Sequence, residues 1–388
     1  MTPGSPSHQL TRADLVRAQV ALIGSTFIAL IGQFMLSPWL VFQLEGRGIS
    51  ASLIGWFSAA SWLGLLLTTP FATQIVRAMG QRRALLLSLA VPLLTAIGIT
   101  QTEHLLWWAG LSFLSGGAMS IRWIVAEACI AELAPDKRRG RIVSFYQTLL
   151  SVAFILAPSL LAWIKPTNPN APWVAVAFLA TGLAITCLVP RLTLADHSQE
   201  QSGFVGLMQA VRNNPAIVVA GFLGGIFELG ITSLLPVYGL ALGFASSTAA
   251  LLIAASGAGS MMVMMPVGEA ADRFAPHRIR LFLVSLILLT SLSALGVSSW
   301  PWLLWGLAFL WGAGGGALYT VSMISLGRVA RGSALISATA VLVLSYTSGG
   351  LIGPIIAGSS IDLSLTWGLG LVAASIAVSA LLAIARTR

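Results

Sequence analysis

Charge, cysteine and histidine are all scarce in this sequence. Only 9% of its 388 residues are charged, whereas 57% are hydrophobic, a composition that excludes an ordinary soluble domain. Both cysteines, Cys129 and Cys187, lie in apolar runs, where cysteine is usually a packing residue, so we expect no disulfide framework and no redox chemistry. The four histidines lie in termini or loops without the spacing of metal ligands. The sequence therefore predicts no metal site and no cofactor.

Motifs for catalysis are missing as well. We find no hydrolytic triad, no Walker sequence and no paired-carboxylate site in the chain. Residues 312–317, Gly-Ala-Gly-Gly-Gly-Ala, fit a loose dinucleotide fingerprint, but no strand precedes them and no acidic residue follows about twenty positions on. We interpret this run as a helix-packing surface. The sequence thus indicates neither an enzyme nor an ATP-driven pump, and we assign no catalytic residue.

Long apolar runs are what the chain has in abundance. A membrane-spanning helix needs about 20 mostly apolar residues, and turn signals divide the chain into twelve segments of that kind. They lie near 18–44, 52–76, 83–100, 105–131, 142–164, 172–189, 215–242, 246–270, 279–299, 301–326, 333–360 and 364–385. The predicted fold is an all-α membrane protein with twelve transmembrane helices.

The net charge of +9 follows the predicted topology. Alternate connections and the termini collect 18 of the 21 lysines and arginines, which define what we call the basic side: Arg12, Arg17, Arg77, Arg82, Arg83, Lys137, Arg138, Arg139, Arg141, Arg191, Arg212, Arg273, Arg278, Arg280, Arg328, Arg331, Arg386 and Arg388. The opposite side has only Arg47 and Lys165, and Arg122 lies within a helix. The positive-inside rule puts both termini of this multi-pass protein in the cytoplasm, in the cell inner (plasma) membrane. No nucleic-acid partner is indicated.

The two halves of the chain resemble each other. Residues 1–189 and 215–388 are separated by the longest polar stretch, 190–214, which we interpret as a cytoplasmic linker. At a shift of 195–198 residues, prolines and glycines of the halves align: Pro38 with Pro236, Gly64 with Gly259, Gly116 with Gly312, and Pro158 with Pro354. A nearly constant shift over five helices indicates two pseudo-symmetric six-helix bundles.

One loop then carries a family resemblance. Residues 268–278, Gly-Glu-Ala-Ala-Asp-Arg-Phe-Ala-Pro-His-Arg, resemble the cytoplasmic loop motif of the major facilitator superfamily, with Ala275 where glycine is usual. The topology, linker and repeats match that superfamily over nearly the whole chain. The resemblance implies a latch that closes the cytoplasmic helix ends in the outward-facing state. That role falls on Asp272, Arg273 and Arg278, with Gly268 at the start of the loop.

Other parts of the chain depart from that pattern or refine it. In the first half, Arg77 stands where the acidic residue of the loop would be, and Ser112 where many members carry an arginine, so any latch is asymmetric. The eleventh segment contains Gly349-Gly-Leu-Ile-Gly353-Pro354, which resembles a signature that antiporter members carry in their fifth helix. Because glycine allows close helix contact and proline removes a backbone donor, we expect a bending gate at Gly353 and Pro354.

Within the superfamily, the chain is most similar to the YcaD-like group. The matching runs are Trp-Ile-Val-Ala-Glu at 123–127, Arg-Gly-Arg at 139–141 and Leu-Ser-Tyr-Thr at 344–347. Glu127 belongs to this shared pattern, whereas Arg122 and Glu228 do not. The resemblance supplies no substrate.

Glu228 is the acidic residue that lies nearest the middle of a predicted helix. It lies near the middle of the segment 215–242, too deep to reach the membrane surface. Desolvation disfavours the ionised form of a carboxyl group, so we predict that Glu228 carries a proton. A neutral carboxylic acid that is hydrogen-bonded to nearby backbone is the structural alternative.

Arg122 and Glu127 share the fourth segment. They are about 140° apart around a helix, so they are poorly placed to pair with each other, and we expect each to find a partner on another helix. Snorkelling of both side chains to the cytoplasmic surface is the alternative. Gln33, Tyr319 and Tyr346 are further candidates for polar groups of a central cavity.

Two classes of function fit these features. The first is a secondary active transporter working by alternating access, in which the halves rock about a midplane site for a small-molecule substrate and protons. Its first form is proton-coupled export (antiport) of a small organic compound; its second is proton-coupled uptake of an organic anion recognised by Arg122. The other class is a non-transporting membrane receptor of the same fold. In either class we expect a monomer in a lipid bilayer.

The segregation of charge generates a first prediction. Cysteines introduced by Asn168→Cys and Asp196→Cys, in a background without Cys129 and Cys187, should react with a membrane-impermeant maleimide from opposite faces of the membrane. The physical reason is that position 168 lies in a connection of the opposite side and position 196 in the basic-side linker. Reaction of both positions from the same face would contradict the topology.

Overall fold

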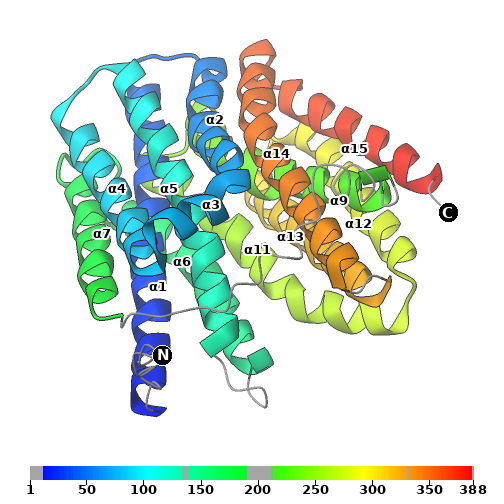
Figure 1. The fold of residues 1–388 in the computed structure, drawn as a ribbon. Helices are drawn as coiled ribbons and strands as arrows, with labels where there is room; N and C mark the ends of the chain where they lie inside the picture. Colours follow the sequence, from blue (N-terminus) through cyan, green and yellow to red (C-terminus); the bar gives the residue numbers. More distant parts are fainter. Residues whose placement is uncertain (1–11, 134–138, 190–210, 213–214, 330–331, 387–388) are drawn as a thin grey trace, which may run out of the picture.

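The computed structural model describes residues 12–133, 139–189, 211–212, 215–329 and 332–386, and this part of the chain is almost entirely helical, with no strand (Figure 1). In the described residues, eleven helical spans are long and apolar enough to cross a membrane, and the helix Ala171–Cys187 is a shorter apolar one. These correspond to the twelve predicted segments, so the predicted fold class is confirmed. Nearly all of the predicted linker lies outside the described residues.

The first half of the chain supplies six of these segments. Their helices are α1 (Arg12–Gly46), α2 (Ala51–Thr68), α4 (Gln81–Gln101), α5 (Leu105–Leu133), α6 (Arg139–Ile164) and α7 (Ala171–Cys187). Helix α2 continues through the 3-10 turn η1 (Thr69–Phe71) into α3 (Ala72–Met79), which reaches the basic side. Within this half α1 packs against α6 and α7, and α5 packs against α2 and α4.

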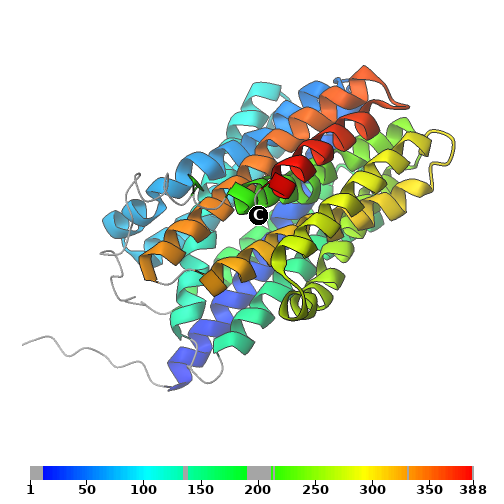
Figure 2. The same cartoon turned by 90° about the vertical axis from the view of Figure 1, so that its right-hand side faces the viewer.

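The second half repeats this plan with one irregular segment. That segment consists of α9 (Pro215–Gly225), the π-helical turn η4 (Ile226–Ile231) and α10 (Thr232–Ala241). The remaining helices are α11 (Ser246–Arg273), α12 (Pro276–Ser293) with the short η5 (Ala294–Gly296), α13 (Leu303–Val329), α14 (Gly332–Leu363) and α15 (Gly368–Arg386). In Figure 2 the red α15 runs between the orange α14 and the yellow α12, and it packs against both.

The halves meet chiefly along two helix pairs. Helix α2 packs against α14, and α6 packs against α11; in Figure 1, α2 and α14 lie side by side at the top, and α14 then runs away from the first half. The two ends of the irregular segment differ in whether they contact the first half. Its opposite-side part, α10, packs mainly against α11 and also reaches α1 and α2 of the first half, whereas its basic-side part, α9, packs against α13, α14 and α15. The structure is therefore closed on the side opposite the basic side.

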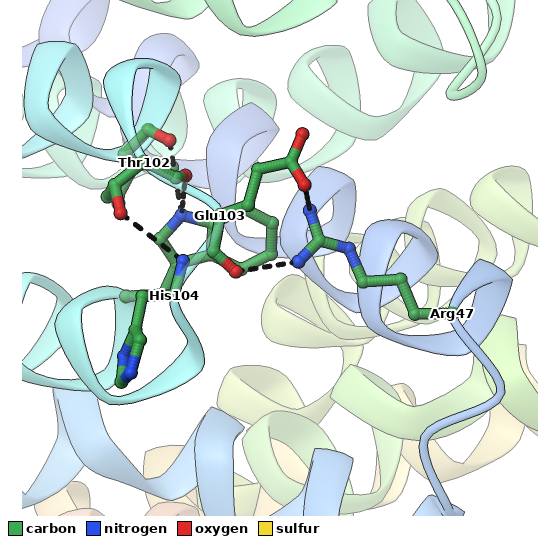
Figure 3. A network of polar contacts seen from close by, with 6 residues as sticks. Arg47, Thr102, Glu103 and His104 are labelled. Atoms are coloured by element: carbon green, nitrogen blue, oxygen red, sulfur yellow. Dashed lines mark hydrogen bonds and ion pairs between the residues drawn. The ribbon is translucent and has the colours of Figure 1, made fainter.

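Arg47, one of the two cations of the opposite side, is held by neighbouring turns of the first half (Figure 3). Its guanidinium donates to the backbone oxygen of Glu103 at 2.8 Å and lies 3.8 Å from the Glu103 carboxylate. It also stacks over the ring of Trp108 at 4.5 Å from the ring centroid, a favourable cation–π arrangement. This exception to the charge distribution thus ties the α1–α2 turn to the α4–α5 turn.

Glycines let α14 approach the irregular segment at backbone distance. A Cβ atom at Gly225 would collide with the carbonyl of Tyr346, and one at Gly349 with the carbonyl of Phe222. At Gly353 a Cβ atom would lie 2.6 Å from the Cα of Gly230, closer than side chains tolerate. The eleventh-segment glycines are therefore contact points between helices, as their sequence suggested.

This close approach generates a prediction on stability. Gly225→Ala should lower the melting temperature of the purified protein, because the added methyl group overpacks the contact with α14 and costs about 1–3 kcal/mol. Gly24→Ala is the matched control, since Gly24 is also helical and a Cβ atom there meets nothing within 4 Å. Equal melting temperatures for the two variants would show that the backbone contact does not limit stability.

Candidate functional site

Glu228 lies in the π-helical turn η4, between α9 and α10. A π turn widens the helix by one residue and occurs frequently at functional sites. The side chain of Thr232 supports the turn, because its hydroxyl donates to the carbonyl of Phe227, five residues earlier, at 3.0 Å. The turn therefore presents Glu228 between α9, which packs within the second half, and α10, which also reaches α1 and α2 of the first half.

Both oxygens of the Glu228 carboxyl group have a hydroxyl partner. Ser260 Oγ, on α11, is 2.5 Å from Oε1, and the hydroxyl of Tyr346, on α14, is 2.7 Å from Oε2. Hydroxyl groups both donate and accept hydrogen bonds, so this pair can donate to the carboxylate, and either hydroxyl can accept the hydrogen bond that the neutral acid donates. The half-buried group is thus solvated by protein in either protonation state.

The glycine run of α13 makes the room that this carboxyl group occupies. A Cβ atom at Gly315 would lie 2.8 Å from the Cβ of Glu228, and one at Gly316 would lie 3.2 Å from Glu228 Oε1 and closer still to Ser260. Gly312 packs in the same way against Ser256. The prediction that residues 312–317 form a helix-packing surface is confirmed, and that surface is one wall of the Glu228 site.

Tyr319 joins the same cluster from α13. Its ring centroid lies 4.8 Å from that of Tyr346, with the rings tilted by 53°, an arrangement favourable for aromatic pairs. The structure therefore brings together three of the predicted site residues, Glu228, Tyr319 and Tyr346, from three separate segments. Ser260 was not predicted, because a single serine in a small-residue helix carries no recognisable signal.

Gln33 lies in a different polar group within the first half. Its side-chain amide exchanges hydrogen bonds with Ser115 of α5, at 3.1 and 3.2 Å. Both residues line a cavity of about 30 Å³ whose polar wall is made by serines from α1, α2 and α5: Ser37, Ser58, Ser61 and Ser112. A cavity of this size is large enough for a water molecule.

Arg122 is buried inside the first half, with 4% of its surface exposed. Its guanidinium donates to Ser25 at 2.5 Å, to Thr26 at 2.8 and 3.1 Å, and to Thr186 at 3.3 Å. The three hydroxyls in turn donate to backbone carbonyls of Leu22 and Gly182, so their lone pairs face the arginine. The partners on other helices that we expected for Arg122 are these hydroxyls of α1 and α7. The side chain of Glu127 lies outside the described part of the structure.

The basic-side loop pairs differently from the family pattern. Asp272 Oδ1 accepts a hydrogen bond from Arg328 at 2.9 Å, and Arg328 also donates to the carbonyl of Ala271 at 2.9 Å. This joins the basic ends of α11 and α13 within the second half. Arg273 and Arg278 are exposed beside it. Arg328 was not assigned to the loop from the sequence, because it lies 56 residues away.

A family model and the fold now identify the class of the protein. The model described as Major Facilitator Superfamily matches residues 22–299. The chain belongs to this superfamily. It is accordingly a membrane transporter of the major facilitator fold and not an enzyme.

Curated relatives of this facilitator cover most of its length. It is 23% identical over 340 residues to the uncharacterized MFS-type transporter YfkF of Bacillus subtilis (strain 168), with 84% of each chain covered. It is 24% identical over 304 residues to the uncharacterized MFS-type transporter YcaD of Salmonella typhi, with 78% of each covered. The expected resemblance to the YcaD-like group is confirmed.

Solved structures resemble the facilitator in fold alone, at low identity. A crystal structure of the nucleoside transporter NupG has a TM-score of 0.76 at 12% identity, covering 95% of this chain and 98% of that one. The D-xylose-proton symporter has a TM-score of 0.70 at 16% identity, covering 96% of each chain.

The geometry around Arg122 generates a prediction. Arg122→Lys should lower the melting temperature without any ligand, with a cost of about 1–3 kcal/mol, because an ammonium group keeps the buried charge but cannot reproduce the planar fork that reaches both α1 and α7. Arg278→Lys, at an exposed position of the basic side, is the matched control. Wild-type stability of Arg122→Lys would show that the hydroxyl contacts do not hold the helices, and would favour a role in anion recognition.

Proposed function

We propose that this facilitator is a proton-coupled secondary transporter in which Glu228 carries the proton. The observation that carries the proposal is the position of this carboxyl group in a π turn, with a hydroxyl from another helix on each oxygen. A group of this kind can hold a proton in one state and release it in another when its hydration changes. No other acidic side chain of the described residues lies at this depth in a spanning segment.

The π turn also gives the proton a way to act on the conformation. On the opposite side of Glu228, α10 packs against α11 and also reaches α1 and α2 of the first half; on the basic side, α9 packs against α13, α14 and α15. Opening of the opposite side must separate α10 from the first half while α9 stays in place. The turn that carries Glu228 is where the segment must bend, so protonation and bending act at one position.

For the substrate, we propose a small organic compound bound between residues 1–189 and residues 215–388, which rock about it as two bundles. The candidate contacts are Glu228, Tyr319 and Tyr346 from the second half and Gln33 from the first. Arg122 already makes four hydrogen bonds to hydroxyls and is buried within the first half. This favours a substrate that is not an anion, and uptake of an organic anion through Arg122 is the second candidate.

For direction and gating, we propose export by proton antiport. The support for export is that the run at Gly353-Pro354 resembles a signature of antiporter members. Uptake together with protons is the alternative direction, because one protein of similar fold is the D-xylose-proton symporter. On the basic side, the loop that begins at Gly268 and contains Asp272, Arg273 and Arg278 forms the gate when that side closes. Arg328 is the arginine that positions Asp272.

We further propose that the protein works as a monomer in the inner membrane, with both termini and residues 190–214 in the cytoplasm.

This proposal generates a prediction on coupling. Glu228→Gln keeps the shape of the protonated acid and its two hydroxyl contacts but cannot release a proton. In proteoliposomes it should lose accumulation driven by a pH gradient, by at least tenfold, while retaining exchange of substrate at equal concentrations. The substrate for this assay is a compound that stabilises the purified protein in a thermal-shift screen of metabolites and drugs, since a specific ligand raises the melting temperature by mass action.

Glu103→Gln is the matched control, because Glu103 is an exposed acid outside both the proposed proton site and the basic-side gate. It should retain gradient-driven accumulation at the wild-type level. Full gradient-driven transport by Glu228→Gln would return Glu228 to the structural role that the sequence left open. Loss of exchange together with accumulation would indicate that Glu228 binds substrate directly rather than coupling it to protons.

A further inference from the structure

A carboxylate of the second half binds the start of a helix of the first half. Asp362, in the last turn of α14, accepts hydrogen bonds from the backbone nitrogens of Ala51 and Ser52 at 3.0 and 2.8 Å and from the Ser52 hydroxyl at 2.5 Å. These residues begin α2, and they are 310 and 311 positions away in the sequence. The three bonds therefore cross between the halves of the transporter.

The chemistry of a helix start explains why a carboxylate belongs there. The first N–H groups of a helix have no partner within it, and they carry partial positive charge that favours an anion. A residue just before the helix usually satisfies one of them, and Ser50 does so for Leu53 at 3.4 Å. The two amides before it, those of Ala51 and Ser52, are satisfied by Asp362 instead. Complete capping of α2 thus depends on the other half of the protein.

The helices below these bonds touch at backbone distance. A Cβ atom at Gly358 would collide with the backbone of Ala51, and one at Gly55 would collide with the carbonyl of Pro354. At Gly350 a Cβ atom would lie 3.2 Å from the ring of Trp62. Asp362 is therefore at the outer end of a continuous α2–α14 contact, which Figure 1 shows at the top.

Among the described residues, the pseudo-symmetric contact between α6 and α11 has no carboxylate at the corresponding position. At the shift of the repeats, the position of Asp362 corresponds to Pro166, after α6. The residue before α11 is Ala245, which makes no side-chain cap bond. In the α6–α11 contact, the ring of Phe154 lies against Gly257. The charge-assisted hydrogen bonds of Asp362 thus distinguish the α2–α14 interface from its pseudo-symmetric counterpart at the corresponding position.

We propose that Asp362 is the latch of the opposite side, which keeps α14 on α2 while the basic side is accessible and must release each time the opposite side opens. When it releases, the amides of Ala51 and Ser52 and the carboxylate of Asp362 exchange their mutual hydrogen bonds for water. Asp362 is exposed and Ser52 half-buried, while Ala51 is buried against α14. Water can reach the amides once the helices separate, so the release exchanges bonds of similar kind and the latch biases the equilibrium without locking it.

The test measures the conformation directly and needs no substrate. Spin labels at His104→Cys and Ser299→Cys, in a background without Cys129 and Cys187, report the distance across the opposite side, because these exposed residues lie on connections of the first and second half respectively. In Asp362→Asn the ratio of open to closed distances should rise about tenfold, since an amide accepts fewer hydrogen bonds than a carboxylate. Ser52→Ala removes one of the three bonds and should give a smaller rise.

Glu103→Gln is the matched control. It removes an acidic group from the same side, but Glu103 pairs with Arg47 inside the first half (Figure 3), so the distance distribution should stay that of the wild type. The proposal is overturned if Asp362→Asn and Ser52→Ala both give wild-type distributions, or if Glu103→Gln shifts the distribution as much as they do. Should Asp362→Asn fail to fold, Ser52→Ala against Glu103→Gln decides alone. Because no proton gradient is applied, either result leaves the assignment of Glu228 untouched.

Discussion

The close backbone contact between α14 and its neighbours is the constraint on which the rest of the structure depends. In a membrane there is little hydrophobic driving force between helices, so tight packing of small residues supplies much of the association. Here glycines on α14 and on the α9–η4 segment let the carbonyl oxygens of each face the other helix directly. Larger residues would separate the helices and carry the hydroxyl of Tyr346 out of reach of Glu228. Packing and chemistry are therefore specified by the same glycines.

The two halves solve the problem of a buried charge in different ways. The first half surrounds Arg122 with hydroxyls that already donate to backbone carbonyls, so the cation has fixed acceptors. The second half surrounds Glu228 with hydroxyls that can reverse their role. An arginine keeps its proton under all biological conditions, whereas a carboxyl group can lose one. The first half therefore contains a permanent charge, Arg122, and the second half contains a group that can exchange its proton, Glu228. We expect proton coupling to act in the second half.

The sequence predicted what depends on composition and local pattern. Twelve apolar segments, the segregation of charge and the depth of Glu228 are all properties of one stretch of chain at a time. It could not predict pairings that depend on how distant helices are rotated, such as Ser260 with Glu228, Arg328 with Asp272, or Asp362 with the start of α2. The π turn was missed for another reason. It adds one residue to a helix, and the glycine-rich sequence around Glu228 is equally compatible with a regular α-helix.

Helix α14 connects the proposed proton site to the proposed latch. Tyr346 contacts Glu228, and Asp362, sixteen residues further on, caps α2; at 1.5 Å per residue these points are about 24 Å apart along the helix. A rigid helix would transmit any displacement of Tyr346 to Asp362. Pro354 lies between them and removes one backbone hydrogen bond of the helix, at the level where its carbonyl meets Gly55. Bending there would let the latch stay closed while the site rearranges, so the stiffness of α14 at Pro354 decides how tightly the two events are coupled.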